Sequence, residues 1–412
     1  MIPRRVAVTG IGAVTPIGHG ADGLWDGVMR NRSAVRRIDR FDASPFPSRI
    51  AAQIDDFVPA DHLDARRARR LDRFSQLSVA AARMASEHAG WTDGVAAPER
   101  TGVWIGSALG GVAFGEQQHA NYVAGGVRAV SPTLATAVFG GAGAANVAID
   151  LGIRGPAIGN ANSCASGATA IGQALHAIRA GIVDSALAGG AEAPLAPLTF
   201  GAFAMIRVLS SRNDDPATAS RPFDTDRDGF VMGEGAAILA LEAWDAAEAR
   251  GAPILGEIAG FGASADAHHL TAPLPSGEAA AAAVTAALRD AGVAPGEIGY
   301  VNAHASSTPL NEVAEARALH RALGSHAATV PVSGTKGLYG HALGASGALE
   351  AAITVLALQR GCLPGTCNLQ TLDAALDLKV LSEPLGAAPA AALSTSFGFG
   401  GMNAALVLLP AG

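Results

Sequence analysis

Two segments of the chain repeat one pattern at a constant offset of 180 residues. The first, ASGATAIGQALHAIRAG, spans residues 165–181, and the second, ASGALEAAITVLALQRG, spans residues 345–361. Each begins with small residues, continues as an apolar helical run and stops at a glycine, which commonly ends a helix. Apolar residues occupy nearly all faces of both helices, and a helix of that kind is buried. The repeat therefore predicts two similar halves packed with these helices at the centre. Identical pairs include Ser166 and Ser346, Gly167 and Gly347, Ala177 and Ala357, and Gly181 and Gly361.

Predicted strands alternate with alanine-rich helices along the rest of the chain. Residues 4–18 read as a strand followed by a glycine turn, residues 64–90 as a helix that ends at Gly90, and residues 101–111 as a strand that enters a glycine loop. Further buried strands are predicted at 184–193, 236–242 and 298–301. This alternation is typical of an α/β fold whose sheets are covered on both faces. With 49% hydrophobic and 5% aromatic residues, we expect a large core of small aliphatic side chains.

Charge and cysteine content exclude several classes of protein. The net charge of −7 argues against a nucleic-acid-binding protein. Uninterrupted apolar stretches of 18 residues are absent, and the N-terminal region lacks the apolar run of a signal peptide. Three cysteines cannot form a disulfide scaffold, and Cys362 with Cys367 supplies too few ligands for a zinc site. The default location is a reducing cytoplasm.

Two short motifs resemble binding loops but fail on one position each. Gly10 and Gly12 begin like a dinucleotide-binding fingerprint, but Thr15 stands where that fingerprint has glycine. Residues 224–235 begin like a calcium loop, but their twelfth position is Gly235 rather than a bidentate glutamate. The sequence therefore predicts neither a dinucleotide nor a calcium site.

Cys164 is the first candidate for chemistry. It lies in NANSCASGATA, directly before the first repeated helix, where unpaired N–H groups favour a thiolate. Small neighbours leave room for a substrate carbonyl. A buried structural cysteine is the alternative interpretation, and position alone does not decide between the two.

Two histidines and two charged residues stand in similar surroundings. His304 follows a predicted strand, and His341 immediately precedes the second repeated helix. Lys336 is one of only two lysines against 27 arginines, which suggests that an ammonium is needed there. Glu350 interrupts an apolar helix, so it needs a partner such as Lys336 or a bound cation. A hydrogen-bonded core or loop histidine is the alternative for either imidazole.

A cluster of arginines at residues 66–70 forms a local basic patch on a net-acidic protein. Such a patch would steer an acidic partner toward the protein. The alternative is an ordinary solvated helix face.

Motifs along nearly the whole chain are together similar to those of the β-ketoacyl-acyl-carrier-protein synthases of the thiolase superfamily. They include RRVAVTGIGAVTPIG, LGIRGP, CASG, AGGAEA, SRPFDTDRDGFVMGEGA, YVNAH, GTK, GHALGASGALE and SFGFGG. The type II elongating enzymes of bacterial fatty-acid synthesis resemble the chain most. The resemblance implies a duplicated βαβαβαββ fold in five layers, α-β-α-β-α, which agrees with the repeat. It also implies an N-terminal half at 1–252 with the nucleophile, a C-terminal half at 253–412 with the remaining catalytic groups, and a dimer, either of identical or of related chains.

The resemblance also implies roles for single residues. Cys164 would accept the acyl group, while His304 and His341 would polarise a malonyl thioester as it loses CO2. Lys336 would order the site, and Glu350 would be linked to Lys336 or to a structural monovalent cation.

Further roles concern the gate, the substrate channel and the partner surface. Phe399 matches a mobile gating residue whose N–H would join that of Cys164 as an oxyanion hole. Other matched positions are Ser306 and Thr308 for the pantetheine arm, Phe397 beside the gate, Leu109, Thr133, Leu134 and Phe203 for the acyl tunnel, and Arg66, Arg69, Arg70, Arg128 and Arg207 for an acidic acyl carrier protein. No redox cofactor and no catalytic metal is expected.

Departures from the family pattern leave alternatives open. Ala305 replaces a glycine, which adds a Cβ where the backbone needs an unusual conformation. Glu312 stands for Asp, Met402 for Thr, and Ala129 removes a docking cation. A ketosynthase of a specialised type II polyketide or polyene pathway is therefore the second interpretation. A non-catalytic chain-length partner is a third, although such partners usually lack the cysteine, and a thiolase would need a second catalytic cysteine near the C-terminus.

Overall fold

The computed structural model describes residues 4–91, 94–95 and 97–411, and within them one βαβαβαββ unit occurs twice. The two units contain the same elements in the same order, as the duplication predicts. The first consists of β1 (Val6–Thr15), α3 (Arg73–His88), β5 (Thr101–Gly106), α6 (Ala142–Leu151), β6 (Ala157–Asn160), α7 (Ser166–Arg179), β7 (Ser185–Glu192) and β8 (Gly235–Ala243). The second consists of β9 (Gly256–Ala265), α10 (Glu278–Ala291), β10 (Tyr300–Asn302), α11 (Asn311–Leu323), β11 (Pro331–Ser333), α13 (Ser346–Arg360), β15 (Ala392–Gly398) and β16 (Met402–Pro410).

Strand order is also the same in both units. The first runs β6-β5-β7-β8-β1 and the second β11-β10-β15-β16-β9. The three strands at the outer end of each series are parallel, and the last three pair antiparallel. The two series join where β1 pairs antiparallel with β9. One sheet thus passes through both units, and the expected division between residues 252 and 253 stays a prediction.

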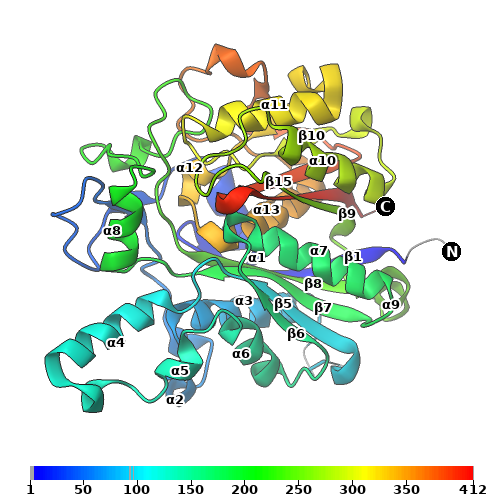
Figure 1. Cartoon of the computed structure of the whole chain (residues 1–412). Coiled ribbons are helices and arrows are strands. Elements are labelled where there is room, and N and C mark those ends of the chain that lie inside the picture. The colour runs from blue at the N-terminus through cyan, green and yellow to red at the C-terminus, as the bar shows by residue number, and fades with distance from the viewer. Residues whose placement is uncertain (1–3, 92–93, 96, 412) are drawn as a thin grey trace.

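The two central helices lie between the two parts of this sheet (Figure 1). α7 contacts β5 and β7 on one side and β9 and β16 on the other, while α13 contacts β8 and β15. α3 and α6 cover the outer face of the first unit, and α10 and α11 cover that of the second. The predicted α-β-α-β-α layers are confirmed. Every residue of α13 from Ser346 to Leu358 is buried, as its all-round apolar pattern requires.

The remaining elements connect or flank these layers. The helices are α1 (Gly20–Met29), α2 (Ala65–Ala68), α4 (Val112–Gly125), α5 (Leu134–Ala137), α8 (Pro197–Met205), α9 (Trp244–Ala249) and α12 (Lys336–Tyr339). The short strands are β2 (Gly18–His19), β3 (Val35–Arg37), β4 (Ile50–Ala52), β12 (Cys362–Leu363), β13 (Lys379–Val380) and β14 (Leu385–Gly386). In the described residues, no helix combines the length and the hydropathy that crossing a membrane requires.

The glycines at the start of the chain lie inside a strand, so the predicted turn there is wrong. Gly10 and Gly12 are part of β1, and a Cβ on either would collide with backbone oxygens of α3. Gly260 and Gly262 of β9 make the same close approach to α10 in the second unit. These glycines let a helix pack directly on a strand, which gives each of them a structural reason to be glycine.

Two other expected elements differ in extent. The helix predicted at 64–90 is broken into α2 and α3, because Asp72 caps a new helix by accepting a hydrogen bond from the N–H of Phe74. Gly90 follows the second helix with φ of +75°, as expected for a helix end. The strand predicted at 298–301 begins only at Tyr300.

Candidate active site

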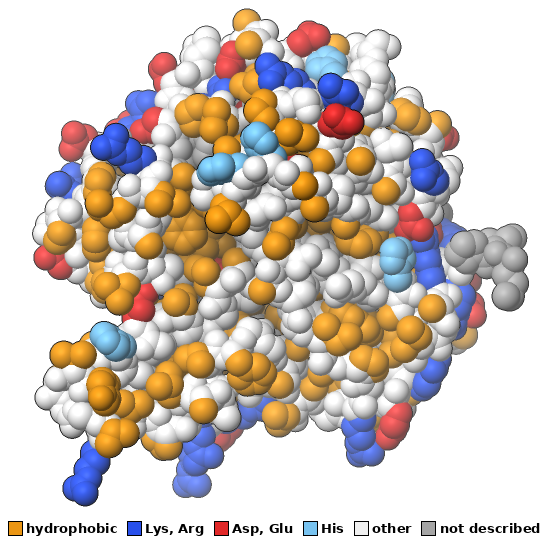
Figure 2. Space-filling view, viewed as in Figure 1, with side chains coloured by type: hydrophobic (Ala, Val, Ile, Leu, Met, Phe, Trp, Pro, Cys, Tyr) orange, Lys and Arg blue, Asp and Glu red, His pale blue; other side chains and the backbone are white. Residues whose placement is uncertain are grey.

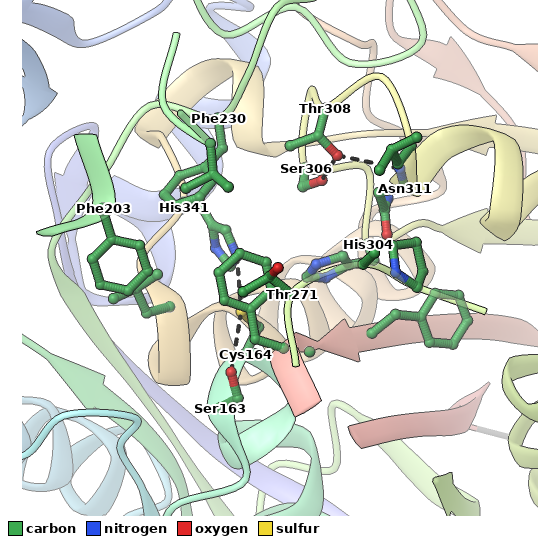
Figure 3. Close-up of a pocket in the computed structure, with 18 of the residues that line it drawn as sticks. Ser163, Cys164, Phe203, Phe230, Thr271, His304, Ser306, Thr308, Asn311 and His341 are labelled. Atoms are coloured by element: carbon green, nitrogen blue, oxygen red, sulfur yellow. Dashed lines mark hydrogen bonds between the residues drawn. The ribbon is translucent and has the colours of Figure 1, made fainter. Parts of the chain in front are cut away.

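A cavity of about 400 Å³ opens between the two units, and Cys164, His304 and His341 all line it (Figure 3). Hydrophobic side chains surround a hollow on the face of the molecule that carries α8 (Figure 2). Cys164 lies in the 3-10 turn that precedes α7, and His341 lies in the loop before α13. The two repeated helices therefore present their N-terminal ends to one cavity.

Three polar groups surround the sulfur of Cys164, which is 6% exposed. His341 Nε2 lies 3.1 Å from Sγ, Ser163 Oγ lies 3.8 Å from it, and the backbone N–H of Phe399 faces it. Burial raises the pKa of the thiol, while Ser163, Phe399 and the Lys336 charge oppose that effect. Burial thus outweighs these three effects, and a base beside the thiol favours formation of the thiolate. His341 is in place for that role.

The backbone around the nucleophile is shaped for close approach. Ser163 has φ of +51°, a conformation that is uncommon for a residue other than glycine. Gly398 packs against this turn, since a Cβ there would lie 3.0 Å from the backbone nitrogen of Cys164. The N–H groups of Cys164 and Phe399 therefore lie on adjacent backbone segments, as an oxyanion hole requires.

His341 is held by its other ring nitrogen. Nδ1 lies 2.8 Å from the hydroxyl of Ser346, and the backbone N–H of His341 donates to the oxygen of Val231. The ring meets the edge of Phe230 with centroids 5.1 Å apart. Burial and the Lys336 charge lower the pKa of His341 well below its ordinary value, so the imidazole is neutral at pH 7.

His304, Lys336 and Glu350 form one buried cluster. The Lys336 ammonium donates to the Glu350 carboxylate and to the backbone oxygen of His304, and its Nζ lies 3.3 Å from His304 Nδ1. The His304 and His341 rings lie 5.3 Å apart, centroid to centroid. Burial and Lys336 lower the pKa of His304 as well. The structure therefore brings together four of the predicted residues, namely His304, His341, Lys336 and Glu350. Burial of the Lys336 ammonium against the Glu350 carboxylate explains why this position is a lysine.

Glu315 is a site residue that the sequence analysis missed. Its carboxylate accepts hydrogen bonds from the N–H groups of His304 and Ala305 at 2.8 Å and from the hydroxyl of Thr395 at 2.7 Å. Glu312 similarly accepts from the N–H groups of residues 307 and 308. The sequence does contain a signal for this support. Two carboxylates lie three residues apart at the start of an alanine-rich helix, directly after the loop that carries His304.

The loop after His304 confirms that Ala305 has an unusual conformation. Its φ is +41°, and Ser307 follows at +68°. Glu315 and Glu312 hold this loop through the N–H groups described above, so the strained backbone is kept by buried hydrogen bonds.

Replacing Ala305 by valine is expected to destabilise the protein by at least about 2 kcal/mol, because a β-branched residue is poorly tolerated at positive φ in a packed site. Ala305→Gly is the matched control and is expected to stay within about 1 kcal/mol of the parent, since glycine adopts this conformation freely. Denaturant unfolding of both variants measures the difference. Equal stability of the two would show that the loop relaxes around the added methyl groups.

The predicted gate lies over the nucleophile. Phe399 stacks on Phe203 with centroids 6.3 Å apart, and Phe397 lies beside His304. The loop that carries Phe399 is tied to the segment after β9, because Gly400 donates to the oxygen of Leu270. Met402, which departs from the family pattern, is 39% exposed at the end of this loop.

The predicted channel residues divide into two groups. Leu109, Phe203, Ser306 and Thr308 line the cavity, and the last two hydroxyls lie 3.0 Å apart. The predicted tunnel positions at the start of α5 do not line it, and their role in an acyl tunnel stays a prediction. They are Thr133 and Leu134, both half-buried.

The predicted docking arginines are exposed. Arg207 lies at the mouth of the cavity. Arg66, Arg69, Arg70 and Arg128 are also exposed, on and after α2 and on the turn that follows α4.

A thiol, a base and backbone donors at the bottom of a cavity define a site for acyl transfer, and comparison with known proteins agrees. The family model described as Beta-ketoacyl synthase, N-terminal domain, matches residues 3–247, and the C-terminal domain of the same family matches residues 255–370. The chain therefore belongs to the β-ketoacyl synthase family, whose enzymes form carbon–carbon bonds by acyl transfer.

One relative and two solved structures show the extent of this similarity. The chain is 42% identical over 404 residues to the 3-oxoacyl-[acyl-carrier-protein] synthase 2 of Synechocystis sp., covering 98% of this chain and 97% of that protein. It resembles the ishigamide ketosynthase/chain length factor with a TM-score of 0.93 and 34% identity over 100% of both chains. It also resembles a type II polyketide ketosynthase solved in complex with its acyl-carrier protein, with a TM-score of 0.92 and 32% identity over 99% of this chain and 100% of that one.

Proposed function

We propose that the protein condenses an acyl group delivered by an acyl carrier protein with malonyl-carrier protein, giving a β-ketoacyl product two carbons longer. The observation that carries this proposal is the convergence of Cys164 Sγ and one ring nitrogen each of His304 and His341, all within 4.8 Å of one another. A nucleophile for the acyl group and two donors for a second thioester thereby share one cavity.

Acylation uses the residues around Cys164. The sulfur attacks the carbonyl carbon of the acyl thioester, the carbonyl oxygen takes the negative charge, and the N–H groups of Cys164 and Phe399 stabilise it. The bond to the carrier sulfur then breaks, and the leaving thiolate takes up the proton that Cys164 gave to His341. The product is an acyl-Cys164 thioester and a free carrier thiol.

Decarboxylation uses the two imidazoles as hydrogen-bond donors. In the described part of the chain, the Ser346 hydroxyl has a single partner, His341 Nδ1, so it satisfies its own proton by donating to that nitrogen. Lys336 faces Nδ1 of His304 in the same way. In this step both rings carry their proton on Nε2, so His341 differs in tautomer from the acylation step, in which its unprotonated Nε2 takes the Cys164 proton while Nδ1–H donates to Ser346. Two Nε2–H donors to the malonyl thioester oxygen stabilise the enolate that forms as CO2 leaves. Its carbon attacks the acyl-Cys164 carbonyl, the bond from that carbonyl to Sγ breaks, and the Cys164 thiolate leaves and takes up a proton from solvent.

The two half-reactions are expected to respond differently to pH. A histidine with the ordinary pKa of about 6.5 is half protonated at that pH and loses its role as a neutral donor below it. Since the pKa values of His304 and His341 are both lowered, malonyl decarboxylation is expected to stay flat from pH 8 to pH 6. Acylation is expected to slow as the pH falls, because the raised pKa of Cys164 leaves less thiolate. Separate pH profiles of CO2 release and of acyl-enzyme formation measure the two half-reactions. A midpoint near pH 6.5 in the decarboxylation profile would contradict the lowered pKa of the two histidine donors.

A structural monovalent cation near Glu350 is part of the proposal. Four buried oxygen atoms lack a hydrogen-bond partner within the described residues, namely Asn302 Oδ1, Glu350 Oε2, Ser394 Oγ and Ser396 Oγ. Asn302 pairs directly with Ser394 across β10 and β15, and its amide nitrogen donates to the backbone oxygen of Glu350. Oxygen atoms of this kind suit a hard cation. Its chemistry would be structural, and no organic cofactor is needed for the reaction.

The carrier protein is expected to dock around the mouth of the cavity. Arg207 stands at that mouth, and the exposed arginines of α2 offer further positive charge to an acidic partner. The structure of a related ketosynthase with its acyl-carrier protein supports this. A cytoplasmic location suits the three free thiols.

The proposed dimer forms through β6. This strand is the end of the strand series, and within the described residues no further strand pairs with it. Its side chains are largely exposed, and Ile149 and Phe139 beside it are 71% and 48% exposed. Hydrophobic side chains spread over this part of the surface in Figure 2. An exposed apolar edge strand favours pairing with a second chain, whether identical or related.

Replacing Ile158 in the middle of β6 by lysine is expected to convert the dimer to monomer, because the charge would be buried against the second chain. Light scattering after size-exclusion chromatography measures the mass. Exposed Ile182 precedes β7, which β5 separates from β6, so Ile182→Lys serves as the control and is expected to leave the dimer intact. A dimer that survives Ile158→Lys would place the interface elsewhere.

A specialised polyketide or polyene pathway remains the second candidate function. The similarity to the ishigamide ketosynthase/chain length factor and the exposed Met402 beside the gate favour it. Both candidate functions use the same condensation reaction. They are distinguished by the acyl starter and the carrier protein that the enzyme prefers.

The direct test supplies the purified protein with acyl-carrier protein and malonyl-carrier protein. Intact mass of the carrier is expected to show a β-ketoacyl chain two carbons longer, together with CO2 release. Acylation of Cys164 without any condensation product would overturn the proposal.

A further inference from the structure

The three groups that converge in the cavity are also a set of metal ligands. Cys164 offers a sulfur, and His304 and His341 each offer a ring nitrogen, with all three atoms within 4.8 Å of one another. His341 Nε2 and Cys164 Sγ are only 3.1 Å apart. A tetrahedral zinc ion has ligand bonds of about 2.0–2.3 Å. The ligand atoms around a zinc ion are therefore spaced much as these three atoms are. Small side-chain shifts would bring all three within bonding distance of one ion.

The donor types favour zinc over harder cations. Thiolate and imidazole suit Zn²⁺, whereas Mg²⁺ and Ca²⁺ take oxygen ligands. Three protein ligands with a fourth position open to a cavity is the arrangement of zinc sites that exchange a ligand. All three side chains are buried, with His304 and His341 at 2% exposure. Few water molecules reach this position, so water competes only weakly with the three side chains for the bound ion.

Neighbouring residues hold both rings through Nδ1, as is usual for metal-bound histidines. The Ser346 hydroxyl at 2.8 Å from His341 Nδ1 can rotate to accept a proton from it. Lys336 Nζ lies 3.3 Å from His304 Nδ1, and its positive charge opposes a dication. A proton must leave the Lys336 and His304 pair when the second ring binds the ion. The site is accordingly weaker than one dedicated to zinc, which makes binding reversible.

We propose that Cys164, His304 and His341 form an inhibitory Zn²⁺ site. Bound zinc would take the sulfur lone pair that attacks the acyl thioester and the Nε2 atoms that serve as donors. An acyl group on Cys164 converts the thiolate to a thioester, which is a poor zinc ligand. Zinc and the acyl group are therefore mutually exclusive, and free enzyme alone is inhibited.

Direct metal binding tests the site without any carrier substrate. Equilibrium dialysis of the metal-free full-length protein with Zn²⁺ is expected to give one ion per chain at this site. Co²⁺ in its place is expected to produce a sulfur-to-cobalt charge-transfer band. Cys164→Ser is expected to remove the band, and His304→Ala and His341→Ala to weaken binding at least about tenfold each.

The chain offers a control in a second thiol, the partly exposed Cys362. Cys362 Sγ lies 3.8 Å from the sulfur of Met29, so this pair is the competing soft site. Cys362→Ser is expected to leave the band and the stoichiometry unchanged. Loss of the band in Cys362→Ser, or its persistence in Cys164→Ser, would overturn the proposal, and circular dichroism checks that each variant is folded.

Exclusivity is tested by alkylation. Zn²⁺ is expected to slow modification of Cys164 by iodoacetamide at least about tenfold, as intact mass reports, and a chelator to restore it. Protein already alkylated at Cys164 is expected to bind no zinc. Unchanged alkylation in the presence of saturating zinc would contradict the site, whereas zinc binding in a protein that fails to condense substrates would refute only the proposed reaction.

Discussion

Replacing Cys164 by serine is expected to lower the rate of condensation at least about 1,000-fold. Removing a catalytic nucleophile has effects of this size or larger, and a serine hydroxyl beside a neutral imidazole ionises far less readily than a thiol. The change removes no packing, because serine fits the space of cysteine in the turn before α7. Incubation with acyl-carrier protein, followed by intact mass analysis, is expected to show no acyl adduct within the time that acylates the parent.

The other two thiols provide the control for this experiment. Cys367 is buried and Cys362 is partly buried, and neither lines the cavity. Cys362→Ser and Cys367→Ser are expected to acylate at the parental rate. An adduct that still forms rapidly in Cys164→Ser, or that disappears in Cys367→Ser, would show that the nucleophile has been assigned to the wrong sulfur.

The duplicated architecture was predictable because the central helices carry their signal in continuous sequence. A helix buried on all faces must be apolar all round, so two such helices at one offset indicate one structural unit used twice. The nucleophile and His341 precede these helices, and their meeting in one cavity follows from the symmetry of the halves. Gly10 and Gly12 lie in a strand rather than in the predicted turn, because a glycine that lets a helix pack against a strand has the same local sequence as one that forms a turn.

The support of the site was harder to predict than its reactive groups. Glu315 acts by accepting the N–H groups of His304 and Ala305, contacts that join a helix to a loop through tertiary structure. A one-dimensional pattern shows a carboxylate on a helix but not the direction it faces. The same reason applies to Thr133 and Leu134, since the path of the chain between α4 and α6 decides which side chains reach the cavity.

The two imidazoles are expected to differ when each is removed. His341 Nε2 contacts the Cys164 sulfur, whereas His304 is anchored to Lys336 and lies 5.3 Å from the His341 ring, centroid to centroid. His304→Ala is therefore expected to lower malonyl decarboxylation about 100- to 1,000-fold while acylation of Cys164 changes less than about tenfold, because one donor to the enolate is lost. His341→Ala is expected to impair both steps, since the base beside the thiol is lost with the donor.

Measuring the two half-reactions separately decides between this division and a purely structural role. CO2 release from malonyl-carrier protein reports the donors, and the rate of the acyl adduct on Cys164 reports the base. A merely structural histidine would slow both steps together in either variant. If His304→Ala slowed acylation as strongly as decarboxylation, the separate roles drawn from the contacts of the two rings would be wrong, because the cluster of His304, Lys336 and Glu350 would then be shaping the nucleophile as well.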